Sequence, residues 1–112
     1  MQAAAPVPTM ASISRPRAAL VELMQRINFG RVERLTVRSG EPVLAPRPRI
    51  IREIKFGGEN GPRPEAARGD FALKAEVRAL FAQLDALGDG IVAVLEIKHG
   101  LPFRMIVEEG AA

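Results

Sequence analysis

Two short segments with the same turn chemistry lie 60 residues apart in this chain, Arg38-Ser39-Gly40-Glu41-Pro42 and Lys98-His99-Gly100-Leu101-Pro102. In each segment a polar residue and a glycine separate two stretches in which apolar and polar side chains alternate. A two-residue connection of this kind favours a type I′ hairpin turn, which requires a positive φ at both central residues. We therefore expect two β-hairpins in one antiparallel sheet.

The similarity between the two regions extends beyond the turns. Aligned without a gap, residues 17–45 and 77–105 are identical at seven of 29 positions, whereas chance pairing at ordinary composition would give about two. The identities are Ala19/Ala79, Leu20/Leu80, Gly30/Gly90, Val32/Val92, Leu35/Leu95, Gly40/Gly100 and Pro42/Pro102. Two unrelated units that each need a residue to end a helix and a tight turn would both contain these glycines. This alternative does not explain why the identities in the helix and in the strand all have the same 60-residue offset. We predict a duplicated helix–strand–strand unit.

Apolar side chains at helical spacing predict two helices. The first covers residues 15–28, with Ser14 as its candidate N-cap. The second covers residues 70–87, with Asp70 as its cap and Gly88 as the residue that ends it.

Alternating apolar and polar residues predict five strands, over 31–38, 41–45, 49–56, 91–98 and the stretch that follows His99-Gly100. Val32 is out of step with Leu35 and Val37, which indicates a bulge or an edge at the start of the first strand. In the fourth strand we expect Ile91, Ala93, Leu95 and Ile97 to be buried.

The third predicted strand places an arginine on its apolar face. Ile50, Ile54 and Phe56 share that face, and Arg52 interrupts it. Because burying an unpaired charge is costly, we expect Arg52 to pair with a carboxylate at the sheet rim or to point into an anion-binding cleft.

The predicted order α-β-β-β-α-β-β is that of an α+β fold, with one mostly antiparallel sheet and two helices on one face. The 112 residues fit one domain, which we assign to residues 14–112, after a flexible Ala/Pro-rich tail over residues 1–13. Residues 46–69 form the connection between the repeat units, with a strand and a basic loop. The chain has no cysteine and no apolar run near the ~20 residues that span a bilayer. We expect a cytoplasmic protein without a membrane contact.

Positive charge is concentrated in the first part of the chain. Residues 14–69 contain 12 Lys/Arg against six Asp/Glu, and residues 70–112 contain four against seven. Guanidinium groups offer bidentate hydrogen bonds to phosphate, and the amides of the glycine-rich loop at residues 57–61 can assist them. The candidate nucleic-acid or anion-binding residues are Arg47, Arg49, Arg52, Lys55, Arg63 and Arg68. The chain has no Trp or Tyr and we expect its five Phe in the core, so contact with the nucleic-acid backbone is predicted rather than base stacking.

The sequence offers little for catalysis. His99 is the only histidine, and its place in a turn is explained by the left-handed φ that His tolerates. The glycine-rich loop lacks the Gly-Lys-Ser/Thr of a phosphate-binding loop. We expect no metal, no cofactor and no enzymatic activity.

The segment Glu53-Ile54-Lys55, on the third strand of an α-β-β-β-α-β order, resembles the PD-(D/E)xK nuclease family. The resemblance implies Glu53 as a magnesium ligand and Lys55 as the residue that orients the attacking water. The family's metal-binding Asp lies on the preceding strand, where this chain offers only Glu41, and the Glu-x-Lys pattern recurs at residues 96–98. The helix and Phe29-Gly30-x-Val32 also resemble short bacterial proteins, which implies no function.

We therefore predict a small non-enzymatic binding module whose basic face contacts an acidic partner, the nucleic-acid backbone before an acidic protein surface. The first alternative is a protein-interaction or self-assembly module, a homo-oligomer that uses strand edges and the opposite charges of the two halves. The second is a PD-(D/E)xK-like nuclease with a degenerate site.

Overall fold

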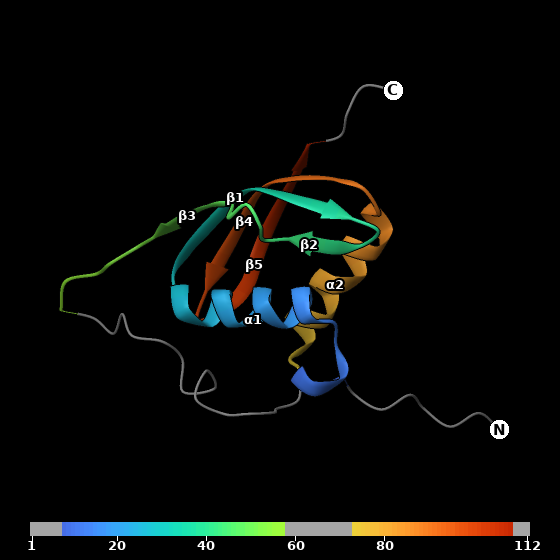
Figure 1. Cartoon of the computed structure of the whole chain (residues 1–112). Helices are drawn as coiled ribbons and strands as arrows, with labels where there is room; N and C mark the ends of the chain where they lie inside the picture. Colours follow the sequence, from blue (N-terminus) through green and yellow to red (C-terminus); the bar gives the residue numbers. More distant parts are fainter. Residues whose placement is uncertain (1–7, 58–72, 109–112) are drawn as a thin grey trace.

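The computed structural model describes residues 8–57 and 73–108 of the chain. The described part contains a short 3-10 helix, two longer helices and five strands (Figure 1). In chain order they are η1 (Met10–Ser12), α1 (Arg15–Ile27), β1 (Gly30–Arg38), β2 (Glu41–Val43), β3 (Arg49–Arg52), α2 (Ala75–Leu87), β4 (Gly90–Lys98) and β5 (Leu101–Glu108). This order confirms the predicted α+β fold.

The five strands form one antiparallel sheet in the order β2-β1-β4-β5. β3 also pairs with β1, along residues 30–33, whereas β2 pairs with residues 36–38. β2 and β3 therefore follow each other along the same edge of β1. Both longer helices lie on one side of the sheet (Figure 1). No described helix covers the other side, which we call the open face.

The core lies between the two helices and the sheet. Its largest fully buried side chains come from both helices and both central strands, and they include Leu20, Met24, Leu35, Leu84 and Leu95. Full burial of such a side chain contributes about 1.5–3 kcal/mol. Among residues 8–13 of the predicted tail, Met10 belongs to this core, and the Pro8 carbonyl accepts a hydrogen bond from the Leu73 amide at 2.9 Å.

β1 contains the irregularity that the position of Val32 indicates. Val32, Leu35 and Val37 are buried, and the three-residue step between the first two requires one extra residue in the strand. Arg34 is this residue, with a φ of 58°; it lies opposite Ala93, and the β1–β4 register is the same on both sides of it. Glu33 and Arg34 therefore both face away from the helices.

β4 has the same burial pattern, in which Val92, Leu95 and Ile97 are buried. The expectation that Ile91 and Ala93 are buried is wrong, because the pairing with β5 shifts between Val92 and Val94. One extra residue reverses which side chains face the core in the first half of the strand.

Both predicted hairpin turns are present. All four central residues have a positive φ: Ser39 51°, Gly40 75°, His99 56° and Gly100 73°. The amide of Gly40 donates to the carbonyl of Gly88 at 2.8 Å, and that of Gly100 to the carbonyl of Asn28 at 2.9 Å. Each turn is thus bound to the end of the helix that belongs to the other half of the chain.

The duplication itself stays a prediction. The β1–β4 register pairs Gly30 with Ile97 and Val37 with Gly90. In the 60-residue alignment Gly30 corresponds to Gly90 and Val37 to Ile97, so each pair is the equivalent of the other. A two-fold relation between the units requires this equivalence. However, β2 has three residues and β5 has eight, so the second strands differ.

Two predicted boundaries differ from the structure. β3 ends at Arg52 instead of residue 56, because Arg52 pairs with Gly30, the first residue of β1. Beyond this point β1 offers no partner, and Ile54 and Phe56 are 53% and 99% exposed instead of buried. α2 begins at Ala75 with Lys74 at the N-cap, and the predicted cap Asp70 lies outside the described residues.

Candidate nucleic-acid interface

The predicted basic residues are only partly brought together. Arg47, Arg49, Arg52 and Lys55 follow one another along the chain beside the β1 edge, and all four are exposed. Arg63 and Arg68 lie outside the described residues.

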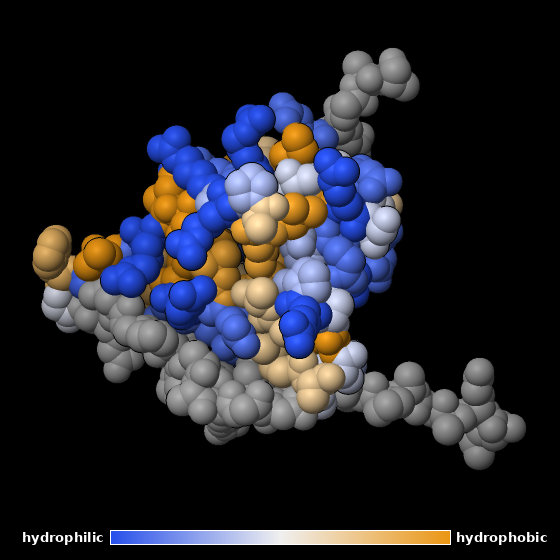
Figure 2. Space-filling model, viewed as in Figure 1, coloured by the Kyte–Doolittle hydropathy of each residue, from blue (hydrophilic) through white to orange (hydrophobic). Residues whose placement is uncertain are grey.

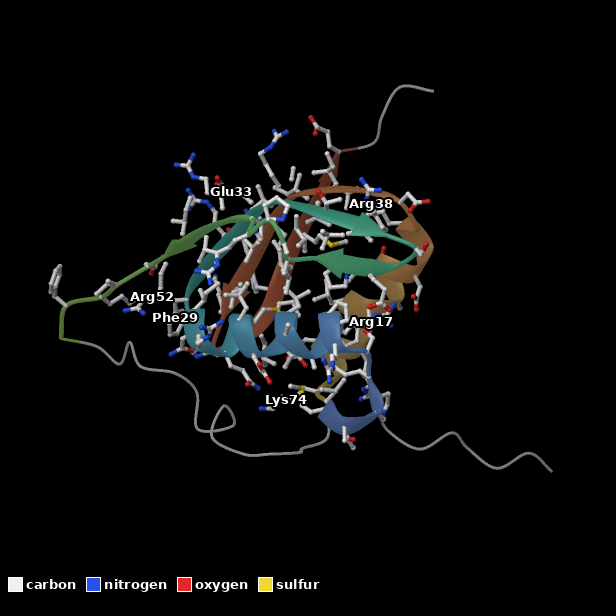
Figure 3. The ribbon with its side chains drawn as sticks, in the orientation of Figure 1. Arg17, Phe29, Glu33, Arg38, Arg52 and Lys74 are labelled. Atoms are coloured by element: carbon white, nitrogen blue, oxygen red, sulfur yellow. The ribbon has the colours of Figure 1, made fainter. Side chains whose placement is uncertain are left out.

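Arg49 and Arg52 face opposite sides of the sheet. Directly opposed residues of paired strands point to the same side. Arg49 opposes Glu33 on the open face, whereas Arg52 opposes Gly30 and shares the helix side with Ile50. The Arg52 side chain extends into solvent (Figure 3), and no described carboxylate forms an ion pair with it. Among the described residues the expected rim pair is therefore not formed, because the strand ends at Arg52 and leaves its side chain exposed.

Lys55 borders a cleft of mixed charge. Its Nζ lies 4.7 Å from the centre of the Phe29 ring and 3.8 Å from Glu53 Oε1, and the His99 ring packs edge-on against Phe29 at 4.8 Å. The cleft has a volume of about 480 Å³, and both Glu-x-Lys segments contribute to its lining. Its lining includes Arg31 and two lysines together with two glutamates, so both signs of charge border the cleft.

The residues that the nuclease resemblance singles out do not lie on a strand. Glu53 and Lys55 follow the end of β3 and are exposed. Within residues 8–57 and 73–108, no group of three or more His, Cys, Asp or Glu could hold a metal ion. The structure thus places these two residues differently from the arrangement that the resemblance implies.

The open face of the sheet carries a second set of arginines, from the central strand β1. The irregularity at Arg34 places Glu33 and Arg34 outward together, between Arg31 and Arg38, which also point outward. Arg34 and Arg38 are exposed, and no described carboxylate pairs with either. Figure 3 shows Glu33 and Arg38 on the side of the sheet that faces away from α1.

The carboxylate of Glu33 lies between Arg31 of β1 and Arg49 of β3. Arg31 Nε donates a hydrogen bond to Glu33 Oε2 at 2.7 Å, and Arg49 Nε lies 3.4 Å from Glu33 Oε1. The hydrogen bond from Arg31 lowers the pKa of the Glu33 carboxyl below its ordinary value. Desolvation opposes this shift, and the charges of Arg31 and Arg49 favour it. Glu33 thus stays ionised and offsets only one of the two positive charges.

A second carboxylate is also placed between two arginines. Across the sheet, Arg31 of β1 opposes Glu96 of β4, and Glu96 opposes Arg104 of β5. Glu96 forms an ion pair with Arg104. The outward positions thus combine Arg31, Arg34, Arg38, Arg49 and Arg104 with Glu33 and Glu96, and Lys98 and Glu108 follow at the strand ends. The surplus charge of the open face is positive, and Figure 2 shows hydrophilic side chains over the strands with apolar surface between them.

Sequence reasoning missed this set, although a signal for part of it was present. The alternation of the first strand already places Arg34, Thr36 and Arg38 on one polar face. The contributions of Arg31 and Arg104 depend on strand pairing and could not be read from local pattern.

The expectation that every Phe lies in the core is wrong. Phe56 is 99% exposed and Phe103 is 59% exposed, and the ammonium of Lys98 lies 4.0 Å from the centre of the Phe103 ring. None of the outward-facing residues of β1 and β4 is aromatic, so the open face itself has no stacking platform on these strands.

Arg17, by contrast, has a structural role on the helix side. Its side chain is 16% exposed, and its Nη2 donates to the Gly40 carbonyl at 3.0 Å and to Asp85 of α2. The guanidinium carbon lies 5.0 Å from the centre of the Phe81 ring. Arg17 therefore connects α1, the first hairpin turn and α2, and these contacts leave it no part in the open face.

A scan against protein-family models and searches of curated proteins and of solved structures found no match for this chain. Neither helix of the described part is long and apolar enough to cross a membrane. Any assignment of function therefore depends on the geometry of the chain.

Proposed function

We propose that this protein binds the phosphate backbone of nucleic acid on the open face of its sheet. The observation that carries the proposal is the pair Arg34 and Arg38, two exposed guanidinium groups on the central strand without a carboxylate partner among the described residues. Arginine forms charge-assisted, bidentate hydrogen bonds with phosphate. Two neighbouring guanidinium groups that form no ion pair with a described carboxylate, on a broad face, are suited to binding a polyanion.

Neighbouring charges support the same proposal. Arg31 and Arg49 share one carboxylate, Glu33, so a phosphate can approach their remaining donors without first breaking a one-to-one ion pair. The segment with Arg47 borders this face, along the β1 edge. In this proposal β1 forms the centre of the interface, and the basic segment that begins at Arg47 contributes at its rim.

The proposed activity is binding without sequence readout, in a cytoplasmic setting. Base-specific contact needs side chains that reach base edges or stack on bases, and the outward residues of β1 and β4 include no aromatic side chain. Contacts with phosphate carry no sequence information, and they weaken steeply as salt concentration rises.

Two matched double variants test the proposal. Arg34→Gln with Arg38→Gln removes two charges from the open face, and Arg15→Gln with Arg26→Gln removes two from exposed positions of α1. Binding of labelled single-stranded and double-stranded oligonucleotides is measured by fluorescence anisotropy at several salt concentrations, after circular dichroism has shown that both variants are folded.

The open-face variant should bind all sequences more weakly, and its slope of log K against log salt should be shallower by roughly one unit per lost phosphate contact. The α1 variant should retain the slope of the wild-type protein. Arg47→Gln with Arg49→Gln measures the contribution of the connecting segment in the same way. Equal losses in the open-face and α1 variants would contradict the proposed surface. A wild-type protein that binds neither DNA nor RNA at low salt would remove nucleic acid as the partner, and an acidic protein surface would replace it.

A further inference from the structure

The last strand has an edge that no described residue pairs with. In the order β2-β1-β4-β5, the strand β5 bonds to β4 on one side only. Pro102 and the register shift next to it lie at the start of the strand, and residues 104–108 form an extended run with no further interruption of β5. Proteins usually protect such edges with prolines, bulges or inward charges. This run has no proline and no inward charge, and the second register shift, opposite Ile106 and Val107, places its extra residue in β4 rather than in β5.

The sequence of this run is complementary to itself. Residues Arg104, Met105, Ile106, Val107 and Glu108 place a positive charge at one end, a negative charge at the other and apolar side chains between them. In an antiparallel pair of two such strands centred on Ile106, Arg104 of each copy opposes Glu108 of the other. A centre one residue away, at Met105 or Val107, would instead place Ile106 opposite Arg104 or Glu108. The charge pattern therefore selects one register.

Apolar surface accompanies this edge. Ile106 is 47% exposed and Phe103 is 59% exposed, and an apolar groove of about 250 Å³ runs between β5 and α2. On this side α2 presents Glu76 at its start, followed by Ala79, Gln83 and Ala86. The last three are small or uncharged and leave room for the same helix of a second copy. Burial of these groups would favour association.

We propose that two copies of this chain form a dimer through β5, in antiparallel register centred on Ile106. The two sheets then become one continuous sheet, with the helices of both copies on the same side. The row of alternating charges formed by Arg31, Glu96 and Arg104 continues into Glu108 of the second copy. A two-fold axis through Ile106 closes the assembly, because each β5 edge is used once.

The first test is the native mass of the purified protein without nucleic acid, measured by sedimentation across a range of concentrations. The wild-type protein should form dimers. Ile106→Lys should yield monomers, because two lysines would oppose each other across the axis. Ile54→Lys, at a similarly exposed position that follows β3 at the opposite edge of the sheet, should leave the dimer unchanged. A monomeric wild-type protein, or an Ile106→Lys protein that still dimerises, would overturn the proposal.

The second test addresses the register. Arg104→Glu and Glu108→Arg each place like charges opposite each other, and each should raise the dimer Kd roughly tenfold or more. A mixture of the two variants should form heterodimers, since every Glu then opposes an Arg. This rescue cannot result from a merely destabilised monomer. A mixture that stays monomeric, like its components, would refute the register. Neither measurement involves nucleic acid, so failure here is distinct from failure of the proposed function.

Discussion

Replacement of Gly30 by alanine should separate β3 from β1. Gly30 has a φ of 154°, which side chains other than glycine rarely tolerate. A Cβ atom at this position would lie 2.2 Å from the carbonyl oxygen of Ile51 and 2.9 Å from the Cα atom of Arg52. Both are main-chain atoms, which cannot rotate away, so β3 itself would have to move.

The expected loss of stability has two parts. The unfavourable φ costs about 1–3 kcal/mol. Displacement of β3 weakens its hydrogen bonds, such as that of the Glu53 amide with the Phe29 carbonyl at 2.8 Å, and each contributes about 1 kcal/mol. The smaller entropy of the unfolded alanine chain offsets about 0.4–1 kcal/mol. We expect the free energy of unfolding to fall by about 2–4 kcal/mol, a large share of the 5–15 kcal/mol typical of a domain.

Gly90, at the corresponding position 60 residues later, provides a matched control. A Cβ atom there would approach the side chain of Leu87, whose Cδ1 lies 2.9 Å away, and this side chain can change its rotamer at a cost of about 0.5–1.5 kcal/mol. The smaller entropy of the unfolded alanine chain offsets part of this cost, so Gly90→Ala should change stability by about 1 kcal/mol or less.

Urea denaturation followed by circular dichroism compares the two variants. With a slope of about 1–3 kcal/mol per molar urea, the midpoint of Gly30→Ala should fall by roughly 1 M or more relative to Gly90→Ala. Hydrogen exchange of the Glu53 amide should accelerate in Gly30→Ala alone. Equal losses in both variants, or an unchanged midpoint for Gly30→Ala, would refute the close approach of β3 to β1.

Two further predictions concern ion pairs. Arg17→Met should lower the free energy of unfolding by about 1–2 kcal/mol, because it removes the hydrogen bond to Gly40 and the contact with the exposed carboxylate of Asp85. Thermal melts of the control variant Arg15→Met, at an exposed position, should show a change within about 0.5 kcal/mol. Equal effects of the two substitutions would contradict the role of Arg17. Because the folded-state pKa of Glu33 is lowered, its stabilisation is present above the ordinary carboxyl pKa of about 4.3 and is lost as pH falls below it. Denaturation from about pH 6 to 3 should therefore show a smaller loss for Glu33→Gln than for the wild-type protein, and identical pH profiles would contradict the shift.

The strongest predictions from the sequence concern features set by local chemistry. Ser39-Gly40 and His99-Gly100 form the expected turns, because positive φ values are a property of the residues in the turn itself. The two helices and the order of the elements follow from periodicity for the same reason, since side chains three and four residues apart share a helix face whatever lies opposite.

Local chemistry could not predict which side chains of a strand face the core, or where the strand ends. In β4 the core side chain is that of Val92 rather than Ile91 or Ala93, because an extra residue is accommodated only where the neighbouring strands set the register. β3 stops at Arg52 because β1 begins at Gly30. A strand exists only as far as its partner does, and the partner lies far away in the sequence.

The candidate interface depends on both kinds of information. Composition identified an excess of arginine in residues 14–69, and alternation placed Arg34 and Arg38 on one face, but neither showed which other arginines share that face. Pairing with β1 separates Arg49 from Arg52, and the irregularity at Arg34 brings Arg31 to the same face as Arg34 and Arg38. The sequence determined how much charge the domain carries and where its turns lie, because both are local properties. Only the tertiary structure decided where that charge gathers, because the direction of each side chain depends on the register of strands distant in the chain.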